Sequence, residues 1–282
     1  MNPSNVSSDV KKYQSGPFIH KWLPRRPHFF FILSWLFPLL LFFVWEYASR
    51  AGWIAAELLP APSKVLSTAI DLIQSGALQR DLLVSLSRAV AGWSIGASIG
   101  FLLGLTVGFS ALAGALLDRT IQMMRAIPFL AMLPLVIVWV GVGEEQKIFM
   151  VALGVTFPVY INTTLGIRQL DPRLLELARV QKLGHFETIR RIVFPAALPS
   201  ILTGVRYSLA TAWLALVIAE TVGASSGIGF LAVDAREFLQ TDIIVLTIVI
   251  YAVIGMSADA IARALERHLL AWHPNYAPGA RR

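Results

Sequence analysis

The sequence predicts an all-α membrane protein that crosses the bilayer six times. Of its 282 residues, 56% are hydrophobic and only 15% are charged, and its mean hydropathy is +0.66. Soluble domains carry charged residues at roughly a quarter of their positions, so this composition excludes an ordinary soluble domain. Six apolar stretches approach the ~20 residues that an α-helix needs to cross a hydrocarbon core. These stretches are 29–47, 89–109, 121–142, 148–167, 199–222 and 243–261.

The distribution of Lys and Arg predicts how the six spans are oriented. Most of the 24 Lys and Arg residues fall in 1–28, 168–199 and 266–282 or at Arg119 and Arg125, which this topology places on one side. Cytoplasmic loops are enriched in these residues, so both termini are expected in the cytoplasm, as basic tails 1–28 and 266–282. The net charge of +7 arises from these same cytoplasmic Lys and Arg residues. We therefore expect them to lie near lipid headgroups and not to bind nucleic acid.

The first span, 29–47, is followed by a segment that we expect on the outer membrane face. Residues 48–88 contain a Pro-rich turn at Pro60 and Pro62 and continue with apolar residues at helical spacing. An amphipathic stretch of this kind lies in the membrane interface and does not cross the bilayer. The membrane core is then expected to occupy 89–265.

The second span carries a glycine at every fourth position. The glycines are Gly92, Gly96, Gly100, Gly104 and Gly108. Small residues at this spacing share one helix face and let the backbone of another helix approach closely. Two readings fit this pattern: static packing inside one subunit, or a closely packed pair of helices that slides during gating.

Spans three and four are expected to form a helical hairpin, because only the short turn GVGEEQK separates them. Pro128 and Pro134 lie in the third span and Pro158 lies in the fourth. Proline removes a backbone donor and bends a membrane helix. We therefore expect fixed bends or hinges at these three positions.

Residues 171–199 form a charged stretch between two apolar spans, and their pattern predicts a helix–turn–helix. Asp171 and Pro172 are typical of an N-cap and a first helical residue. Gly184 suits a left-handed turn at the end of the first helix, and the second, amphipathic helix is expected to end at Pro195. A charged stripe follows the first helix at every third position: Arg173, Glu176, Arg179 and Lys182.

The sequence holds few groups that could support catalysis or bind a metal. The five His residues are scattered without ligand spacing, and there is no G-x-x-x-x-G-K-[ST] loop to cradle ATP phosphates. We therefore expect no catalytic residue, no metal site and no cofactor in this chain.

Arg206 is an exception, because it lies several residues inside the fifth span, where a charge is costly. It is expected either to extend to the cytoplasmic surface or to line a path for an anion. Glu220 lies four turns further on, roughly 21 Å along the helix, so it is expected at the outer face, out of reach of Arg206. Other polar or aromatic residues could line the same path, although most such residues hold helices together. They are Asn162, Thr163, Thr164, Thr211 and Trp213.

The charged hairpin resembles the EAA coupling loop of ABC-importer permeases. The positions that match the loop are Glu176, Leu177, Ala178, Ile192, Phe194 and Pro195. Two features depart from the family pattern. Leu177 replaces a small alanine, and Lys182 stands where the family has a glycine, with Gly184 two residues later. The turn between the two helices is therefore expected to be shifted.

The resemblance extends over about residues 59–276, to the permeases of nitrate, sulfonate and bicarbonate importers. The stretch from Glu220 to Asp242 is most similar to aliphatic sulfonate permeases. The resemblance implies a type I ABC-importer transmembrane domain in the bacterial cytoplasmic membrane. Its implied partners are a second copy of the chain, two cytoplasmic ATP-binding subunits that carry ATP and Mg, an extracytoplasmic binding protein, and membrane lipid.

The resemblance also implies roles for particular residues. The hairpin would couple to the ATPase through Arg173, Glu176, Leu177, Ala178, Arg179, Lys182, Gly184, Ile192 and Pro195. The outer loop would contact the binding protein through Glu220, Ser225, Ser226, Asp234, Arg236 and Glu237. The implied cargo is a small organic anion, an aliphatic sulfonate, with taurine, nitrate or a thiamine precursor as alternatives. An ion-coupled secondary transporter is an alternative of another class, but it would need a relay of intramembrane carboxylates, and the spans contain almost none.

Overall fold

The computed structural model describes residues 27–273, and all regular structure in this range is helical. The basic tail expected at 1–28 lies outside the described residues except for Pro27 and His28, which begin the first helix. The part of the C-terminal tail from 274 onwards lies outside them too. Residues 266–269, expected in that tail, belong to the last helix.

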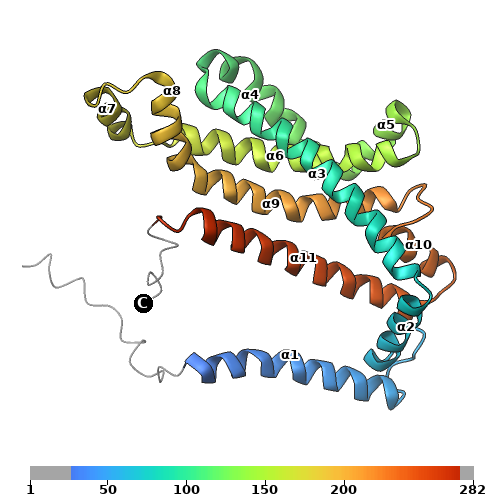
Figure 1. Cartoon of the computed structure of the whole chain (residues 1–282). Coiled ribbons are helices and arrows are strands. Elements are labelled where there is room, and N and C mark those ends of the chain that lie inside the picture. The colour runs from blue at the N-terminus through green and yellow to red at the C-terminus, as the bar shows by residue number, and fades with distance from the viewer. Residues whose placement is uncertain (1–26, 274–282) are drawn as a thin grey trace, which may run out of the picture.

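Twelve helical segments follow one another along the described chain (Figure 1). They are α1 (Pro27–Arg50), α2 (Pro62–Gln74), α3 (Ala77–Phe109), α4 (Ala111–Ala126), α5 (Phe129–Val140), α6 (Glu144–Arg168), α7 (Pro172–Val180), α8 (His185–Thr188), the π-helical η3 (Ile189–Val193), α9 (Phe194–Glu220), α10 (Ile228–Glu237) and α11 (Thr241–Leu269). The core is formed where α6 packs between α3 and α9. α11 lies against α9, and α1 stands apart from this core in Figure 1.

The expected all-α membrane protein is confirmed. Four described helical runs are long and apolar enough to cross a membrane: α3, α6, α11 and the continuous run His185–Glu220. The bent pair α4 and α5 passes the same test jointly, which gives up to five in the described part of the chain. α1 is an unbroken helix of 24 residues. The count of six spans stays a prediction.

The third span is not one helix, contrary to the expectation of a continuous stretch at 121–142. α4 ends at Ala126 and α5 begins at Phe129, and the two are bent by 102°. The cause is Pro128, since proline disfavours the helical conformation of the residue before it. Ile127 is accordingly extended, with ψ 126°. Pro134 and Pro158 lie inside α5 and α6 without interrupting them.

The glycine face of α3 packs against α6 within the same chain. A Cβ at Gly96 or Gly100 would collide with the backbone of Ala152 or Thr156. Thr156 also donates a hydrogen bond from its hydroxyl to the Gly96 carbonyl at 3.2 Å. Only glycine permits this backbone-to-backbone approach, so the glycines serve packing inside one subunit in this structure.

The segment 48–88, expected on the outer face, comprises the end of α1, all of α2 and the first part of α3. α2 is amphipathic, as expected, and its buried side includes Val65 and Thr68. The Thr68 hydroxyl donates to Asp242 Oδ2 at 2.7 Å and so ties α2 to the start of α11. α3 begins at Ala77, well before the expected span start at 89. α2 and the start of α3 lie at the end of the molecule opposite α7 and α8 in Figure 1.

Candidate functional site

The helix–turn–helix expected at 171–199 is present as α7, α8 and η3, which we call the coupling hairpin. It lies at the end of the molecule where α1 begins and α11 ends (Figure 1). The Asp171 carboxylate caps α7 by accepting a hydrogen bond from the Arg173 N–H at 2.9 Å, and Pro172 occupies the first turn. Glu187 and Arg191 pair at 3.3 Å across one turn of the second half.

The turn of the coupling hairpin differs from the expectation. Gly184 is extended, with φ −65°, while Lys182 takes the left-handed conformation with φ 54°. Leu183 N–H donates to the Ala178 carbonyl and Lys182 N–H to the Arg179 carbonyl, each at 3.0 Å. This pair of bonds is a Schellman C-cap, in which the left-handed position favours glycine. The prediction for Gly184 was wrong, and Lys182 stands in the left-handed position itself.

Replacing Lys182 by glycine is expected to stabilise the protein, by about 0.5–1 kcal/mol. A left-handed conformation costs an L-residue roughly 1–2 kcal/mol, part of which glycine loses again through its larger unfolded-state entropy. The thermal unfolding midpoint of the purified chain in detergent would rise in Lys182→Gly. Gly184→Ala is the companion test: an added Cβ meets nothing within 4 Å there and the φ suits alanine, so the midpoint should not fall, as it would if Gly184 held the left-handed position. A lower midpoint in Lys182→Gly would contradict the assignment of the turn.

Pro195 does not end the second helix of the hairpin, contrary to the expectation. The chain continues helically from His185 to Glu220. Pro195 lies in the first turn of α9, where its missing N–H leaves the regular i→i−4 pattern incomplete. The preceding stretch η3 accommodates the change as a π-helix, with Phe194 N–H donating to the Ile189 carbonyl five residues earlier.

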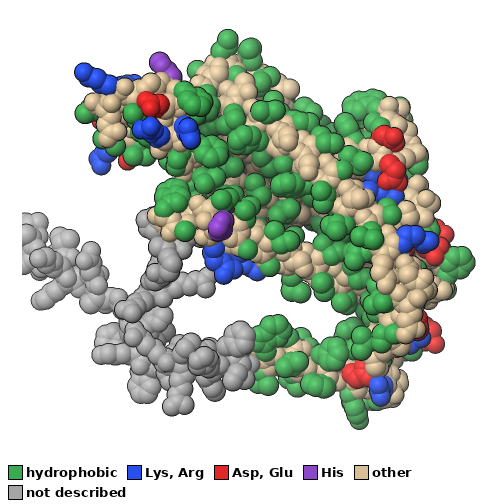
Figure 2. All heavy atoms as spheres, viewed as in Figure 1, with side chains coloured by type: hydrophobic (Ala, Val, Ile, Leu, Met, Phe, Trp, Pro, Cys, Tyr) green, Lys and Arg blue, Asp and Glu red, His purple; other side chains and the backbone are tan. Residues whose placement is uncertain are grey.

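The coupling hairpin exposes a surface that is both charged and apolar. Arg173, Glu176, Arg179 and Lys182 are exposed on it. Val180 and Phe186 are exposed by 80% and 75% of their surface, and Leu177 by 47%. In Figure 2 Lys, Arg and His side chains are frequent at this end of the molecule. Large exposed apolar side chains among charges are typical of a surface that binds a partner.

Some residues expected to couple to a partner serve the inside of the hairpin instead. Ala178 is only 2% exposed, and Ile192 and Pro195 are half-buried. Together with the exposed Gly184, these positions set the shape of the hairpin, while the charged stripe and Leu177 form its outer surface.

Glu220 is not at the outer surface, contrary to the expectation that it contacts a partner there. Its side chain is 1% exposed and accepts a hydrogen bond from Arg88 Nη1 at 2.8 Å. The Ser85 hydroxyl lies 2.8 and 2.9 Å from its two oxygens, and Gly229 N–H donates to Oε2 at 2.8 Å. A buried carboxylate needs such compensation, because an unpaired buried charge is very costly.

Arg88 extends this buried network to the start of α6 and to the loop between α9 and α10. Its guanidinium donates to Glu144 at 2.5 and 2.6 Å and to the Ser226 carbonyl at 2.7 Å. Arg88 is the last residue of the segment 48–88 that was expected on the membrane surface, yet its side chain is only 3% exposed. The sequence carried no local signal for this contact, since Glu220 lies 132 positions away from Arg88.

The remaining outer residues differ in their accessibility. Ser225, Arg236 and Glu237 are exposed, whereas Ser226 and Asp234 are half-buried. They lie in or next to α10, at the end of the molecule opposite the coupling hairpin (Figure 1).

Arg206 is neutralised by α11. Its Nη2 lies 2.6 Å from Asp259 Oδ1, and its Nη1 lies 3.8 Å from Glu266. Asp259 also pairs with Arg263. Arg206 therefore neither extends alone to the surface nor presents a free cation to an anion in this structure.

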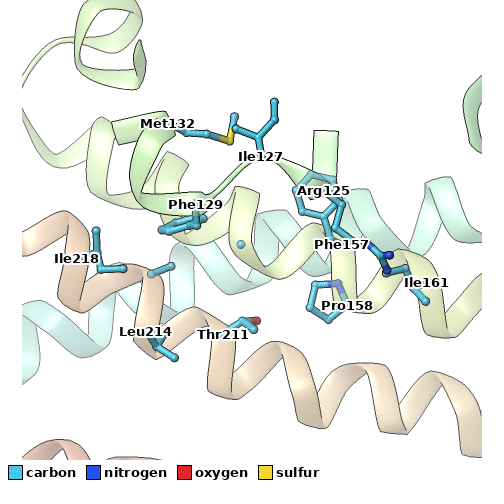
Figure 3. A pocket seen from close by; sticks show the side chains of 12 residues that line it. Arg125, Ile127, Phe129, Met132, Phe157, Pro158, Ile161, Thr211, Leu214 and Ile218 are labelled. Atoms are coloured by element: carbon cyan, nitrogen blue, oxygen red, sulfur yellow. The ribbon is translucent and has the colours of Figure 1, made fainter. Parts of the chain in front are cut away.

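The other expected path residues are dispersed. Thr163 is fully buried where Gly104 of α3 packs, and Asn162 donates to the Pro158 carbonyl at 2.9 Å. Thr164 donates to the Gly104 carbonyl at 3.3 Å, so Thr163 and Thr164 hold α6 against α3, whereas the Asn162 bond lies within α6. Trp213 packs edge-on against the ring of Tyr251. Thr211 lines a pocket beside Arg125, at the bend between α4 and α5 (Figure 3).

Residues 96–270 match the family described as the binding-protein-dependent transport system inner membrane component. The chain belongs to this family. The matched residues run from Gly96 in α3 through the helical core and the coupling hairpin to the end of α11. The chain is therefore a membrane-spanning permease of the ABC-transporter type, in an inner-membrane family. In these systems the ATPase is a separate subunit.

Two curated relatives of this permease family are aliphatic sulfonates transport permease proteins named SsuC. That of Escherichia coli (strain K12) is 46% identical over 258 residues, which cover 92% of this chain and 96% of the relative. That of Bacillus subtilis (strain 168) is 42% identical, over 90% of this chain and 92% of the relative. The taurine transport system permease protein TauC of Escherichia coli (strain K12) is 30% identical, over 86% of this chain and 94% of the relative.

A solved ABC-importer membrane subunit shares the fold of this permease. The structure is similar to the MetNI methionine ABC transporter in inward-facing conformations, with a TM-score of 0.53 and 22% sequence identity. The match covers 67% of this chain and 96% of that chain. The expected type I ABC-importer fold is thereby confirmed. Among residues 27–273 no three His, Cys, Asp or Glu side chains gather closely enough to hold a metal ion.

Proposed function

We propose that this chain is the permease subunit of an importer for an aliphatic sulfonate. The observation that carries the proposal is the 46% identity over nearly the whole chain with SsuC of Escherichia coli, a protein named for aliphatic sulfonates. The 30% identity with TauC is lower over a similar length, so an aliphatic sulfonate is favoured over taurine.

Two copies of the chain form the translocation unit, and the coupling hairpin docks on a separate cytoplasmic ATP-binding subunit. The exposed stripe of Arg173, Glu176, Arg179 and Lys182 supports this role, together with the exposed Leu177. Charged groups around apolar anchors give a docking surface both orientation and affinity. ATP and Mg bind the partner, and this chain hydrolyses nothing itself.

The hairpin end of the molecule faces the cytoplasm, and both termini lie on that side. The location of the start of α1 and the end of α11 beside the hairpin supports this orientation (Figure 1), as does the Lys and Arg content of the hairpin. The α10 region then faces outward, where Asp234, Arg236 and Glu237 contact an extracytoplasmic binding protein that delivers the cargo.

The proposal is tested by growth and uptake. A strain that lacks this permease is expected to lose growth on ethanesulfonate as sole sulfur source, to keep growth on sulfate, and to recover with the plasmid-borne gene. Uptake should require ATP and survive collapse of the proton gradient. Uptake that depends on the gradient would point to an ion-coupled transporter. Loss of growth on taurine, or of nitrate or thiamine-precursor uptake, with ethanesulfonate use intact would contradict the substrate.

A further inference from the structure

A half-open pocket lies where the bend between α4 and α5 meets α6 and α9 (Figure 3). Its volume is about 360 Å³, and its lining is apolar except for Arg125 and Thr211. Pockets that hold small molecules measure roughly 300–1,000 Å³ and combine apolar walls with a few polar groups. The pocket therefore has the size and composition of a small-ligand site.

The charge of Arg125 is not balanced by a carboxylate of the described residues. The arginines of α3, α6 and α9 are paired: Arg88 with Glu144 and Glu220, Arg168 with Asp118, and Arg206 with Asp259. In Figure 3 the guanidinium of Arg125 extends beside Pro158 and Ile161, at one end of the pocket. The Arg125 side chain is exposed in the single chain, so its N–H donors can meet an anion that enters the pocket. The structure thus leaves a place for an anionic ligand at this end.

The opposite end of the pocket is apolar. Phe129, Leu214 and Ile218 lie there in Figure 3, at a distance from the Arg125 guanidinium. The Phe129 ring packs beside Gly154, where an added Cβ would lie 3.4 Å from it, in ordinary contact. These walls can cover an alkyl chain, since burying each CH₂ group is favourable by about 0.8 kcal/mol.

Thr211 does not compete with Arg125 for an anion. Its hydroxyl donates within α9, to the carbonyls of Tyr207 and Ser208 at 3.2 and 3.0 Å. Its remaining capacity is that of an acceptor, which an anionic headgroup does not satisfy. Arg125 is therefore the residue that would bind the anionic headgroup of a ligand in this pocket.

We propose that this pocket binds the transported anion inside the membrane, with its sulfonate on Arg125 and its alkyl chain along Phe129, Leu214 and Ile218. The inference rests on the proposed function and adds the residues that select the cargo. A guanidinium presents paired N–H donors that match the oxygens of an oxyanion. Nitrate has no chain to cover the apolar end. Taurine would place its ammonium there, where a charge is unfavourable.

The test measures uptake of labelled ethanesulfonate and hexanesulfonate by the complete transporter. Arg125→Gln is expected to lower uptake of both at least tenfold, and Arg125→Lys to retain part of it. Arg119→Gln, on the same helix but outside the pocket lining, should stay within twofold of wild type. Membrane level and co-purification of the ATP-binding subunit establish that each variant is folded and assembled.

A second pair of variants tests the apolar end. Leu214→Phe is expected to lower hexanesulfonate uptake at least fivefold more than ethanesulfonate uptake, because the added ring shortens the pocket. Leu116→Phe is the matched control, since Leu214 and Leu116 are 65% and 66% exposed and Leu116 does not line the pocket. Equal losses for the two chain lengths would overturn the proposal.

Two results separate this inference from the proposed function. If wild type takes up neither sulfonate, the proposed function fails, and the pocket assignment with it. If wild type takes up both and Arg125→Gln stays within twofold of it, only the pocket assignment is overturned. An anionic phospholipid is the other possible ligand, and native mass spectrometry detects it. If Arg125→Gln loses a bound phospholipid but retains sulfonate uptake, the pocket is assigned to lipid.

Discussion

Glu176→Lys is expected to abolish ATP-coupled uptake, to the background of a strain without the permease. Glu176 is exposed on the stripe of α7 that the proposed function assigns to the ATP-binding subunit. A lysine there meets the same partner surface with the opposite charge, and like charges brought together at a contact cost several kcal/mol. Within α7 it also lies one turn from both Arg173 and Arg179, but such pairs destabilise a helix by only about 0.2–0.5 kcal/mol each.

The loss is therefore expected at the docking step and not in folding. The measurements are uptake, the amount of permease in the membrane, and co-purification of the ATP-binding subunit. Glu237→Lys makes the same charge change at the opposite end of the molecule, and there the co-purified ATP-binding subunit should remain. Wild-type uptake in Glu176→Lys would refute the role given to the coupling hairpin.

Arg88→Ala is expected to be among the most destabilising single changes in the chain, by about 3–5 kcal/mol. The substitution leaves the carboxylate of Glu220 buried, with Ser85 and Gly229 but without its cation. It also releases Glu144 of α6 and the Ser226 carbonyl of the outer loop. Three separate parts of the outer end would lose their common anchor.

The double variant distinguishes lost packing from an unpaired charge. In Arg88→Met with Glu220→Gln neither position of the pair carries a charge, so the unpaired carboxylate of Arg88→Ala is absent and the thermal midpoint should lie above that of Arg88→Ala. Arg50→Ala is the control at the same end, because Arg50 pairs with Glu46 while 66% of its side chain is exposed. Exposed pairs contribute about 0–1 kcal/mol. Equal destabilisation by Arg88→Ala and Arg50→Ala would contradict the importance of the buried network.

Local patterns in the sequence were sufficient to predict most helices but not the long-range polar contacts between them. The Asp171–Pro172 cap, the apolar spans and the glycine face of α3 are recognisable because their signals recur within a few residues. Pro128 predicted a bend between α4 and α5, but the bend angle of 102° depends on how α5 packs against α6.

The partners of Arg88 and Arg206 could not be foreseen. Glu220, Glu144 and Asp259 lie 132, 56 and 53 positions away from their arginines, and no local period connects such pairs. The left-handed Lys182 was missed for a different reason. Glycine propensity favoured Gly184, whereas the hydrogen bonds at the end of α7 put the left-handed residue at 182, where the family pattern has its glycine. Sequence patterns therefore locate the hairpin, whereas its turn and the outer network require coordinates.

The second half of the coupling hairpin and α9 form one helical run of 36 residues, from His185 to Glu220. At about 1.5 Å per residue this run is ~54 Å long. One end carries the surface assigned to the ATP-binding subunit, and the other carries the buried carboxylate that holds the outer loop. The run therefore connects the two ends of the molecule through one continuous helix. A rotation of the hairpin about the helix axis is therefore expected to rotate Glu220 as well. The π-helical turn at Ile189–Val193 is the place where the run could bend instead.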